Sequence, residues 1–236
     1  MRLLVDNFHV FAGGFWVTFQ LCVIAAFTAL ALGTLLAILR VSPLAPLRMV
    51  AAGYVAAFRN LPLTVVFFFA AFGLPALGSN ASILRLPGLD LLFRRLGTDL
   101  PYFRFAVLAL SLYTAAFVCE AIRAGINAVP AGQAEAGRAI GLTFTQNLRL
   151  VILPQAWRAA IVPLGSAIIA MIKNSALAGF FGVVGDLAQT ADQLTSAEGN
   201  PFIPVAIGIS IGYLVLTVPL GLLLDRVERG RAAASR

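Results

Sequence analysis

Few charged or polar side chains interrupt the long apolar runs of this sequence, and those few could do chemistry. Arg59 begins the stretch RNLPLTVVFFF. Glu120 lies three residues before Arg123, and Lys173 begins the stretch KNSALAGFFGVVGDL. A charge inside a bilayer is costly unless it is paired or wet, so such residues usually serve a transport path or a partner. The chemistry they suggest is recognition of a charged solute.

Catalytic arrangements are not found in the sequence. No nucleophile is paired with a base, and no paired carboxylates fall in a plausible pocket. His9 is the single histidine, while Cys22 and Cys119 fall inside apolar runs and are expected to pack as small hydrophobes. The phosphate-binding pattern GxxxxGK[ST] is missing, so this chain is not expected to hydrolyse ATP by that route. We expect no enzyme activity, no metal site and no cofactor.

Arg59 and Glu120 each have two interpretations. Arg59 either extends its guanidinium to the lipid headgroups or presents a cation to an anionic group of a substrate, beside a kink at Pro62. Glu120 either forms a structural pair with Arg123, which lies on the same face of a helix, or binds the amino group of a substrate.

Lys173, Asn174 and Ser175 also have two interpretations. They follow an apolar run, and three glycines come within the next twelve residues. One interpretation is a polar cap at the membrane interface. The other is a helix that ends near mid-membrane, where unpaired backbone groups meet a polar solute.

The elements that position these residues follow from composition. The chain of 236 residues is 60% hydrophobic and 11% charged, with a mean hydropathy of +0.93. These values are typical of an integral membrane protein, and long rather than alternating apolar runs indicate helices. We predict five transmembrane helices, at about residues 15–39, 50–74, 103–126, 154–172 and 202–224.

The arginines predict how these spans are oriented. With the N-terminus outside, three arginine-bearing regions fall on one side: the loop after the first span, the region 123–149 and the C-terminal tail. The positive-inside rule makes that side cytoplasmic. The loop at 75–102 is an exception because it carries Arg85, Arg94 and Arg95. The net charge of +7 therefore reflects topology and not binding of nucleic acid.

Three further segments are assigned from their polarity. The stretch 75–102 is too polar to span and too apolar to be a free linker, so we expect short interfacial helices there. Residues 177–194 are predicted to enter the membrane without crossing it, and 186–200 to form an acidic external segment. The first ten residues lack the basic start of a cleaved signal peptide.

A short soluble-looking segment, EAGRAIGLTFTQNLRLVILP, separates the third span from the fourth. Apolar residues at 136, 139, 140 and 142 form one face at helical spacing. Gly141 is predicted to end this helix because glycine accepts the left-handed conformation of a helix C-terminus. Pro154 suits the start of the next helix, where its missing N–H costs little. We expect a helix on the membrane surface whose apolar edge is covered by a partner.

This segment resembles the EAA loop of ABC-importer permeases. The resemblance rests on spacing: Glu-Ala-x is followed by three residues and a Gly, and then by nine residues and Val-x-Leu-Pro. Two residues depart from the usual pattern, with Gly137 in place of a second Ala and Val151 in place of the commoner Ile. The alternative is an ordinary cytoplasmic loop. In that family the loop, here about 131–154, forms a coupling helix that docks on the ATPase. The resemblance thus implies coupling roles for Glu135, Ala136, Gly137, Gly141 and Leu142.

Other stretches resemble the polar amino acid branch of the same permeases, which transports histidine, glutamine, glutamate or arginine. RNLPL is similar to the Arg-Gly-Thr-Pro-Leu element of the second span, although Asn60 and Leu61 depart from it. KNSALAG is similar to the Lys-Asp/Asn-Thr/Ser-Ser-Leu-Ala run of polar amino acid permeases. YTAAFVCEAIRAGIN and LPQAWRAAIVPLG look most like actinobacterial glutamate permease subunits. The candidate residues of the substrate path are Arg59, Glu120, Lys173, Asn174 and Ser175.

The resemblance implies an all-α, five-span transmembrane domain of the type I importer class, with residues 1–236 as one domain in a bacterial plasma membrane. The implied partners are two ATPase subunits, an identical or sister permease, an external solute-binding protein and membrane lipid. The expected solute is glutamate, with glutamine, arginine or histidine as alternatives. The alternative of another class is a secondary transporter driven by an ion gradient. Against it stand the missing internal repeat and the scarcity of buried carboxylates.

Overall fold

The computed structural model describes residues 2–76, 101–182 and 185–234, in which all regular structure is helical. The elements in chain order are α1 (Arg2–Asp6), α2 (Phe8–Val41), α3 (Ala45–Asn60), α4 (Leu63–Phe68), the π-helical turn η1 (Phe69–Gly73), α5 (Leu74–Ala76), α7 (Pro101–Asn127), α8 (Ala131–Ala139), α9 (Phe144–Asn147), the π-helical turn η3 (Leu148–Ile152), α10 (Leu153–Asn174), α11 (Leu177–Phe180), α12 (Leu187–Asp192), the π-helical turn η4 (Gln193–Ala197) and α13 (Phe202–Ala234).

Four helical stretches are long and apolar enough to cross a membrane, and the bent pair α3–α4/α5 makes a fifth candidate. The predicted all-α, five-span class is thereby confirmed. The observed helices extend beyond the predicted spans, since α2 has 34 residues where 25 were expected. At 1.5 Å per residue, α2 is about 50 Å long and exceeds the roughly 30 Å hydrocarbon core.

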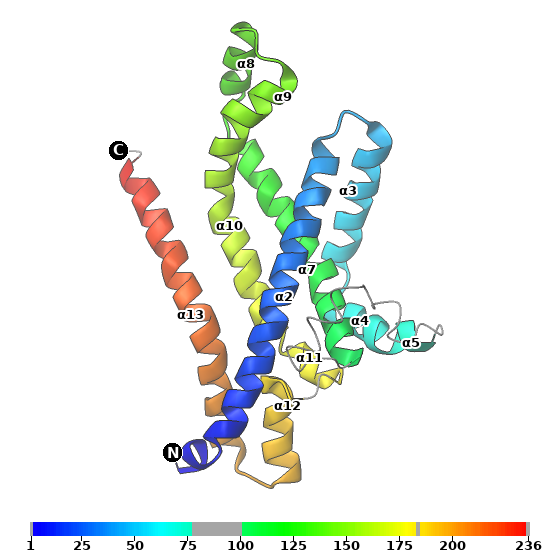
Figure 1. Cartoon of the computed structure of the whole chain (residues 1–236), viewed down its shortest axis with the longest axis vertical. Helices are drawn as coiled ribbons and strands as arrows, with labels where there is room; N and C mark the ends of the chain where they lie inside the picture. Colours follow the sequence, from blue (N-terminus) through cyan, green and yellow to red (C-terminus); the bar gives the residue numbers. More distant parts are fainter. Residues whose placement is uncertain (1, 77–100, 183–184, 235–236) are drawn as a thin grey trace.

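The second span is broken. Helices α3 and α4 meet at Leu61 and Pro62 with a bend of 103°. Pro62 adopts an extended backbone conformation and caps the start of α4, and proline restricts the preceding residue to extended conformations as well. The interruption predicted near Arg59 and Pro62 is therefore present, and α4 lies across the bundle (Figure 1).

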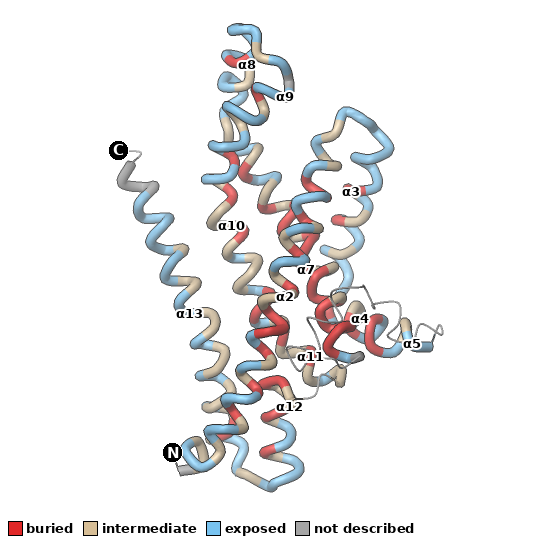
Figure 2. Tube along the Cα trace, in the orientation of Figure 1, coloured by how far each residue is buried: buried red, intermediate tan, exposed pale blue. Residues whose placement is uncertain are grey.

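Helix α7 forms the centre of the bundle, between α2 and α10. Small residues allow close packing on both sides. A Cβ at Gly33 would lie 2.6 Å from Val118 Cβ, and a Cβ at Gly125 would lie 2.8 Å from Ala160 Cβ. Buried residues accordingly concentrate along α2 and α7, whereas α13 is largely uncovered (Figure 2). Such apolar outer surfaces are covered by lipid or by another subunit.

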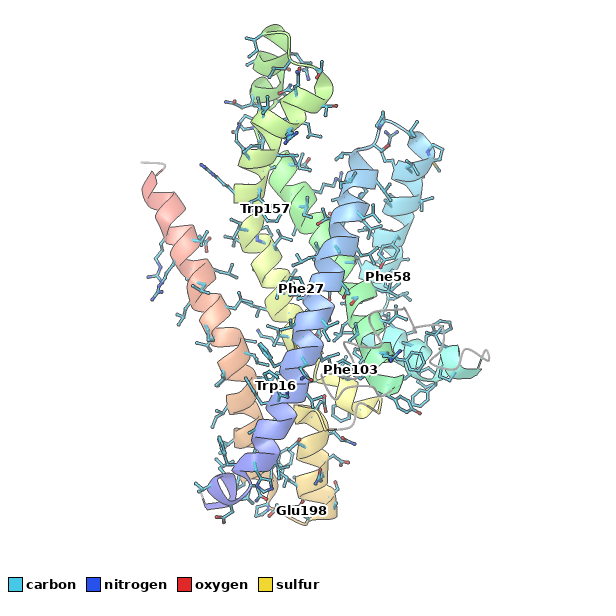
Figure 3. The ribbon with its side chains drawn as sticks, viewed as in Figure 1. Trp16, Phe27, Phe58, Phe103, Trp157 and Glu198 are labelled. Carbon is cyan, nitrogen blue, oxygen red and sulfur yellow. The ribbon has the colours of Figure 1, made fainter. Side chains whose placement is uncertain are left out.

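The two ends of the bundle differ. Helices α8 and α9, the α2–α3 turn and the C-terminal end of α13 lie towards one end, and α1, α12 and η4 lie towards the other (Figure 1). Trp16 and Trp157, both exposed, lie on α2 and α10, with Trp157 nearer to the α8 end (Figure 3). The first of these ends carries the three arginine-bearing regions that were assigned to one side of the membrane.

The described part of the segment at 177–194, which was predicted to enter the membrane, contains α11, α12 and the start of η4. The N–H of Leu187 donates to Thr18 Oγ1 on α2 at 3.0 Å, so the start of α12 is held against the first span. Most of the predicted interfacial segment at 75–102 lies outside the described residues. Cys22 and Cys119 are both buried free thiols, as expected of small hydrophobic residues.

Candidate functional site

The segment between α7 and α10 folds into two short helices, which we call the α8–α9 hairpin (residues 131–147). Its turn is a Schellman motif. Gly141 has a φ of +85°, Gly141 N–H donates to Arg138 O at 3.0 Å, and Leu142 N–H donates to Gly137 O at 3.1 Å. Gly141 thus ends α8 as predicted, because a residue with a side chain is strained at this φ.

Helix α9 begins with a capping box formed by Thr143 and Gln146. The Thr143 N–H donates to Gln146 Oε1 at 2.9 Å, and the Gln146 N–H donates to Thr143 Oγ1 at 3.3 Å. Beyond α9, the helical conformation continues through η3 into α10, with Pro154 in its first turn. The stretch from Thr145 to Phe180 is continuous enough to count as one apolar helix of 36 residues.

The outer side of α8 is uncovered. Glu135 and Ala136 are exposed, Ile140 at the end of the helix is 78% exposed, and Gly137 is the one buried residue of α8. The apolar edge predicted for this segment therefore faces outward, with Leu142 partly buried in the turn. A helix with so little of its own surface buried is suited to docking on another protein.

A second group of charged residues surrounds Glu120 on α7, and we call it the Glu120 cluster. The Glu120 carboxylate accepts from the Arg40 guanidinium on α2. Arg59 Nη1 on α3 lies 3.7 Å from Glu120 Oε2, and Arg123 Nη1 lies 3.9 Å from Glu120 Oε1. Glu120 and Arg123 lie close together, as expected, and Arg59 belongs to the same cluster.

The Glu120 cluster carries an excess of positive charge. Three guanidiniums face one carboxylate, which leaves two positive charges uncompensated within the cluster. Arg40 is mostly covered at 16% side-chain exposure, whereas Arg59 and Arg123 are 50% and 45% exposed. The guanidiniums of Arg59 and Arg123 are therefore accessible to an anionic group.

Arg40 was not among the predicted site residues. Its position just before the Ser42–Pro43 turn marked it as the end of the first span. Nothing in the local sequence indicates a partner 80 residues away.

Lys173, Asn174 and Ser175 lie at the turn that separates α10 from α11 within the helical stretch Thr145–Phe180. Lys173 is exposed, Asn174 is partly buried, and Ser175 is fully buried with its Oγ donating to Ile172 O at 2.7 Å. Within the described residues, Lys173 does not belong to the Glu120 cluster. The turn nevertheless adjoins the broken second span, because Phe181, just after α11, stacks on Phe67 of α4 with centroids 5.5 Å apart.

Asp186, which precedes α12, was predicted only as part of an acidic external segment. It is completely buried, and its Oδ1 accepts from Gln189 N–H at 2.8 Å. Its Oδ2 accepts no hydrogen bond from the described residues.

A match to a known protein family identifies this architecture. The family described as binding-protein-dependent transport system inner membrane component matches residues 29–232. The chain belongs to this family. Its members are membrane permease subunits of ABC importers and not enzymes themselves. This permease is therefore a multi-pass protein of the inner membrane that works with ATPase and solute-binding partners.

Individual relatives agree with this assignment. The permease is 42% identical to the glutamate transport system permease protein GluC of Corynebacterium efficiens over 220 residues, which cover 92% of both chains. It is 37% identical to the probable glutamine ABC transporter permease protein GlnM of Bacillus subtilis over 229 residues, covering 97% and 96%. The resemblance to polar amino acid permeases found in the sequence is thus confirmed.

A solved structure supports the same conclusion. The crystal structure of an amino acid ABC transporter with histidines superposes with a TM-score of 0.81 at 31% identity, covering 97% of both chains. The permease therefore has the transmembrane fold of type I ABC importers. The alternative of a secondary transporter is not favoured by any of these similarities.

Proposed function

We propose that this permease forms the translocation path of an ATP-driven importer for a polar amino acid, with glutamate as its solute. The similarity to the glutamate permease GluC along 92% of both chains carries the proposal. The charge of the Glu120 cluster supports it, because two accessible guanidiniums suit a solute with two carboxylates. Glutamine, arginine or histidine are the alternatives within the class, and glutamine is favoured by the similarity to GlnM.

The complete transporter would contain two permease subunits, identical or sister, with two ATPases and an external binding protein. Residues 1–236 form one permease domain, with the N-terminus outside and the C-terminus in the cytoplasm. The loop at 131–154 would dock on the ATPase through Glu135 and the exposed apolar edge of α8. Closure of the ATPases would then move α10 through the helical connection of η3, and rock the bundle from inward-open to outward-open.

Substrate contacts are proposed at the broken second span and at the turn between α10 and α11. Arg59 ends α3 at the first place, and Lys173, Asn174 and Ser175 lie at the second. The two places adjoin through Phe67 and Phe181. Helix ends inside a membrane protein expose unpaired backbone groups, which suit a polar solute. Because the Glu120 carboxylate already faces three guanidiniums, it would bind a substrate ammonium only if one of them moved away.

The test is uptake of labelled glutamate into liposomes that contain the permease with its ATPase and binding protein. Uptake should require ATP and should be competed more strongly by unlabelled glutamate than by glutamine or arginine. Stronger competition by glutamine would indicate that glutamine, and not glutamate, is the transported solute. Uptake that persists without ATP under a sodium or proton gradient would instead support the secondary transporter and overturn the proposal.

A further inference from the structure

One side chain connects the two arms of the α8–α9 hairpin across its inner face. Asn147, at the end of α9, is 3% exposed, and its Nδ2 donates to Ala134 O in the middle of α8 at 2.7 Å. The bond joins residues 13 apart in the chain and lies inside the hairpin. The bond is partly buried, whereas the capping bonds of Thr143 are exposed.

The approach of Asn147 to α8 depends on the absence of a side chain at Gly137. A Cβ at this position would lie 2.7 Å from Asn147 Cγ and 3.0 Å from Asn147 Nδ2, and closer still to Oδ1. The Cα–H of Gly137 therefore points at Oδ1, which accepts no conventional hydrogen bond from the described residues. A Cα–H···O contact supplies a weak partner for this oxygen.

Helix α8 also contacts η3, but Gly137 is its one buried residue. Its other residues are exposed or only partly buried, and the turn at Gly141 is a point about which the helix can pivot. Asn147 also stands directly before η3, which continues into α10. A force applied to α8 can therefore reach α10 by two connections, the turn at Gly141 and the Asn147–Ala134 bond.

We propose that Asn147 is a positioning residue for energy coupling: its bond to Ala134 O, permitted by Gly137, makes α8 and the base of α10 move as one body. The proposal rests on the function proposed above, in which α8 docks on the ATPase. Without the bond, α8 follows the ATPase while α10 lags, so that ATP is hydrolysed with less transport.

The test uses the complete transporter in liposomes and measures glutamate imported per ATP hydrolysed. Asn147→Ala removes the bond, and the nearly isosteric Asn147→Asp replaces the donor by a carboxylate oxygen that the Ala134 carbonyl repels. Gly137→Ala displaces Asn147 from Ala134 O. Each change is expected to lower the ratio about three- to ten-fold, the effect of losing one partly buried hydrogen bond. Gly132→Ala is the matched control, because a Cβ at Gly132 of the same helix meets no atom within 4 Å.

The double variant Gly137→Ala/Asn147→Ala separates positioning from general damage. Because Gly137→Ala acts through Asn147, the double variant should match Asn147→Ala and not the product of the two single effects. ATPase subunits should co-purify with every variant as with the parent, and the melting temperature should fall only slightly, because one partly buried hydrogen bond is lost. Multiplicative losses, or variants that transport like Gly132→Ala, would overturn the role of Asn147 while leaving the proposed function intact.

A second measurement covers the case in which a variant fails to assemble. Hydrogen exchange over residues 131–139 of the purified permease should be at least several-fold faster in Asn147→Ala than in the parent, because α8 loses its tie to α9. Equal exchange in the two proteins contradicts the proposal. Failure of the proposed function appears separately, as a parent complex that neither retains the ATPase nor requires ATP for uptake.

Discussion

The Glu120 carboxylate on α7 accepts from the Arg40 guanidinium on α2, 80 residues away along the chain. This pair joins the first span to the central helix, and Arg59 attaches the end of α3 to the same carboxylate. Glu120 thus holds three elements together and reduces the mutual repulsion of three guanidiniums. The pairing is a structural role, and the accessible faces of Arg59 and Arg123 remain open to a solute.

Replacing Glu120→Gln should destabilise the permease, because three neighbouring cations lose their only counter-charge within the cluster. Breaking a buried pair costs about 3–5 kcal/mol. Glu120 is 30% exposed, so we expect about 1–3 kcal/mol, or roughly 5 °C in melting temperature. The double variant Arg40→Gln/Glu120→Gln should recover part of this loss. Glu228→Gln, at an exposed carboxylate on α13, is the control, and an equal effect there would contradict the role of Glu120.

Gly141→Val should uncouple ATP hydrolysis from transport. Valine at a φ of +85° is strained by about 1–3 kcal/mol, so the Schellman turn would open and α8 would leave its orientation. Membrane insertion and ATPase activity should persist while glutamate uptake falls. Gly132→Val, in the open part of α8, should transport nearly normally. Unchanged uptake in Gly141→Val would count against the coupling role of this segment.

Local patterns predicted the elements of this protein better than their contacts. The five spans follow from long apolar runs, the break at Pro62 from the chemistry of proline, and the end of α8 from Gly141. Each of these depends on residues close together in the chain. The same holds for the neighbourhood of Glu120 and Arg123, which are one helical turn apart.

Contacts between distant residues were missed for the converse reason. Arg40 reaches Glu120 only because α2 packs on α7, and the burial of Asp186 depends on α2, α11 and α12 together. Gly137 appeared in the sequence as a small departure from the Ala of the family pattern. The structure supplies its physical reason, since Asn147 occupies the space that an alanine methyl group would need.

Reporter fusions at the two termini should give opposite results. The arginine-bearing loops lie at the same end of the bundle as the C-terminus and away from the N-terminus (Figure 1), and the positive-inside rule assigns that end to the cytoplasm. A fluorescent protein that folds only in the cytoplasm should be bright at the C-terminus and dark at the N-terminus. An alkaline phosphatase fusion, active only outside, should show the reverse. A C-terminal fusion active only outside would reverse the topology and remove α8 from the ATPase side.

Arg59→Ala and Lys173→Ala should weaken glutamate uptake at low concentration more than at saturation. A hydrogen bond to a charged group contributes roughly 1.5–3 kcal/mol, or about a ten- to hundred-fold change in affinity. Arg59 is half exposed and 3.7 Å from Glu120, so its loss should affect folding little. Arg48→Ala is the control, because Arg48 is exposed in the first turn of α3 and its Nη1 donates to Ser42 O at 3.4 Å. If all three variants import glutamate like the parent, the substrate path does not run past these two cations.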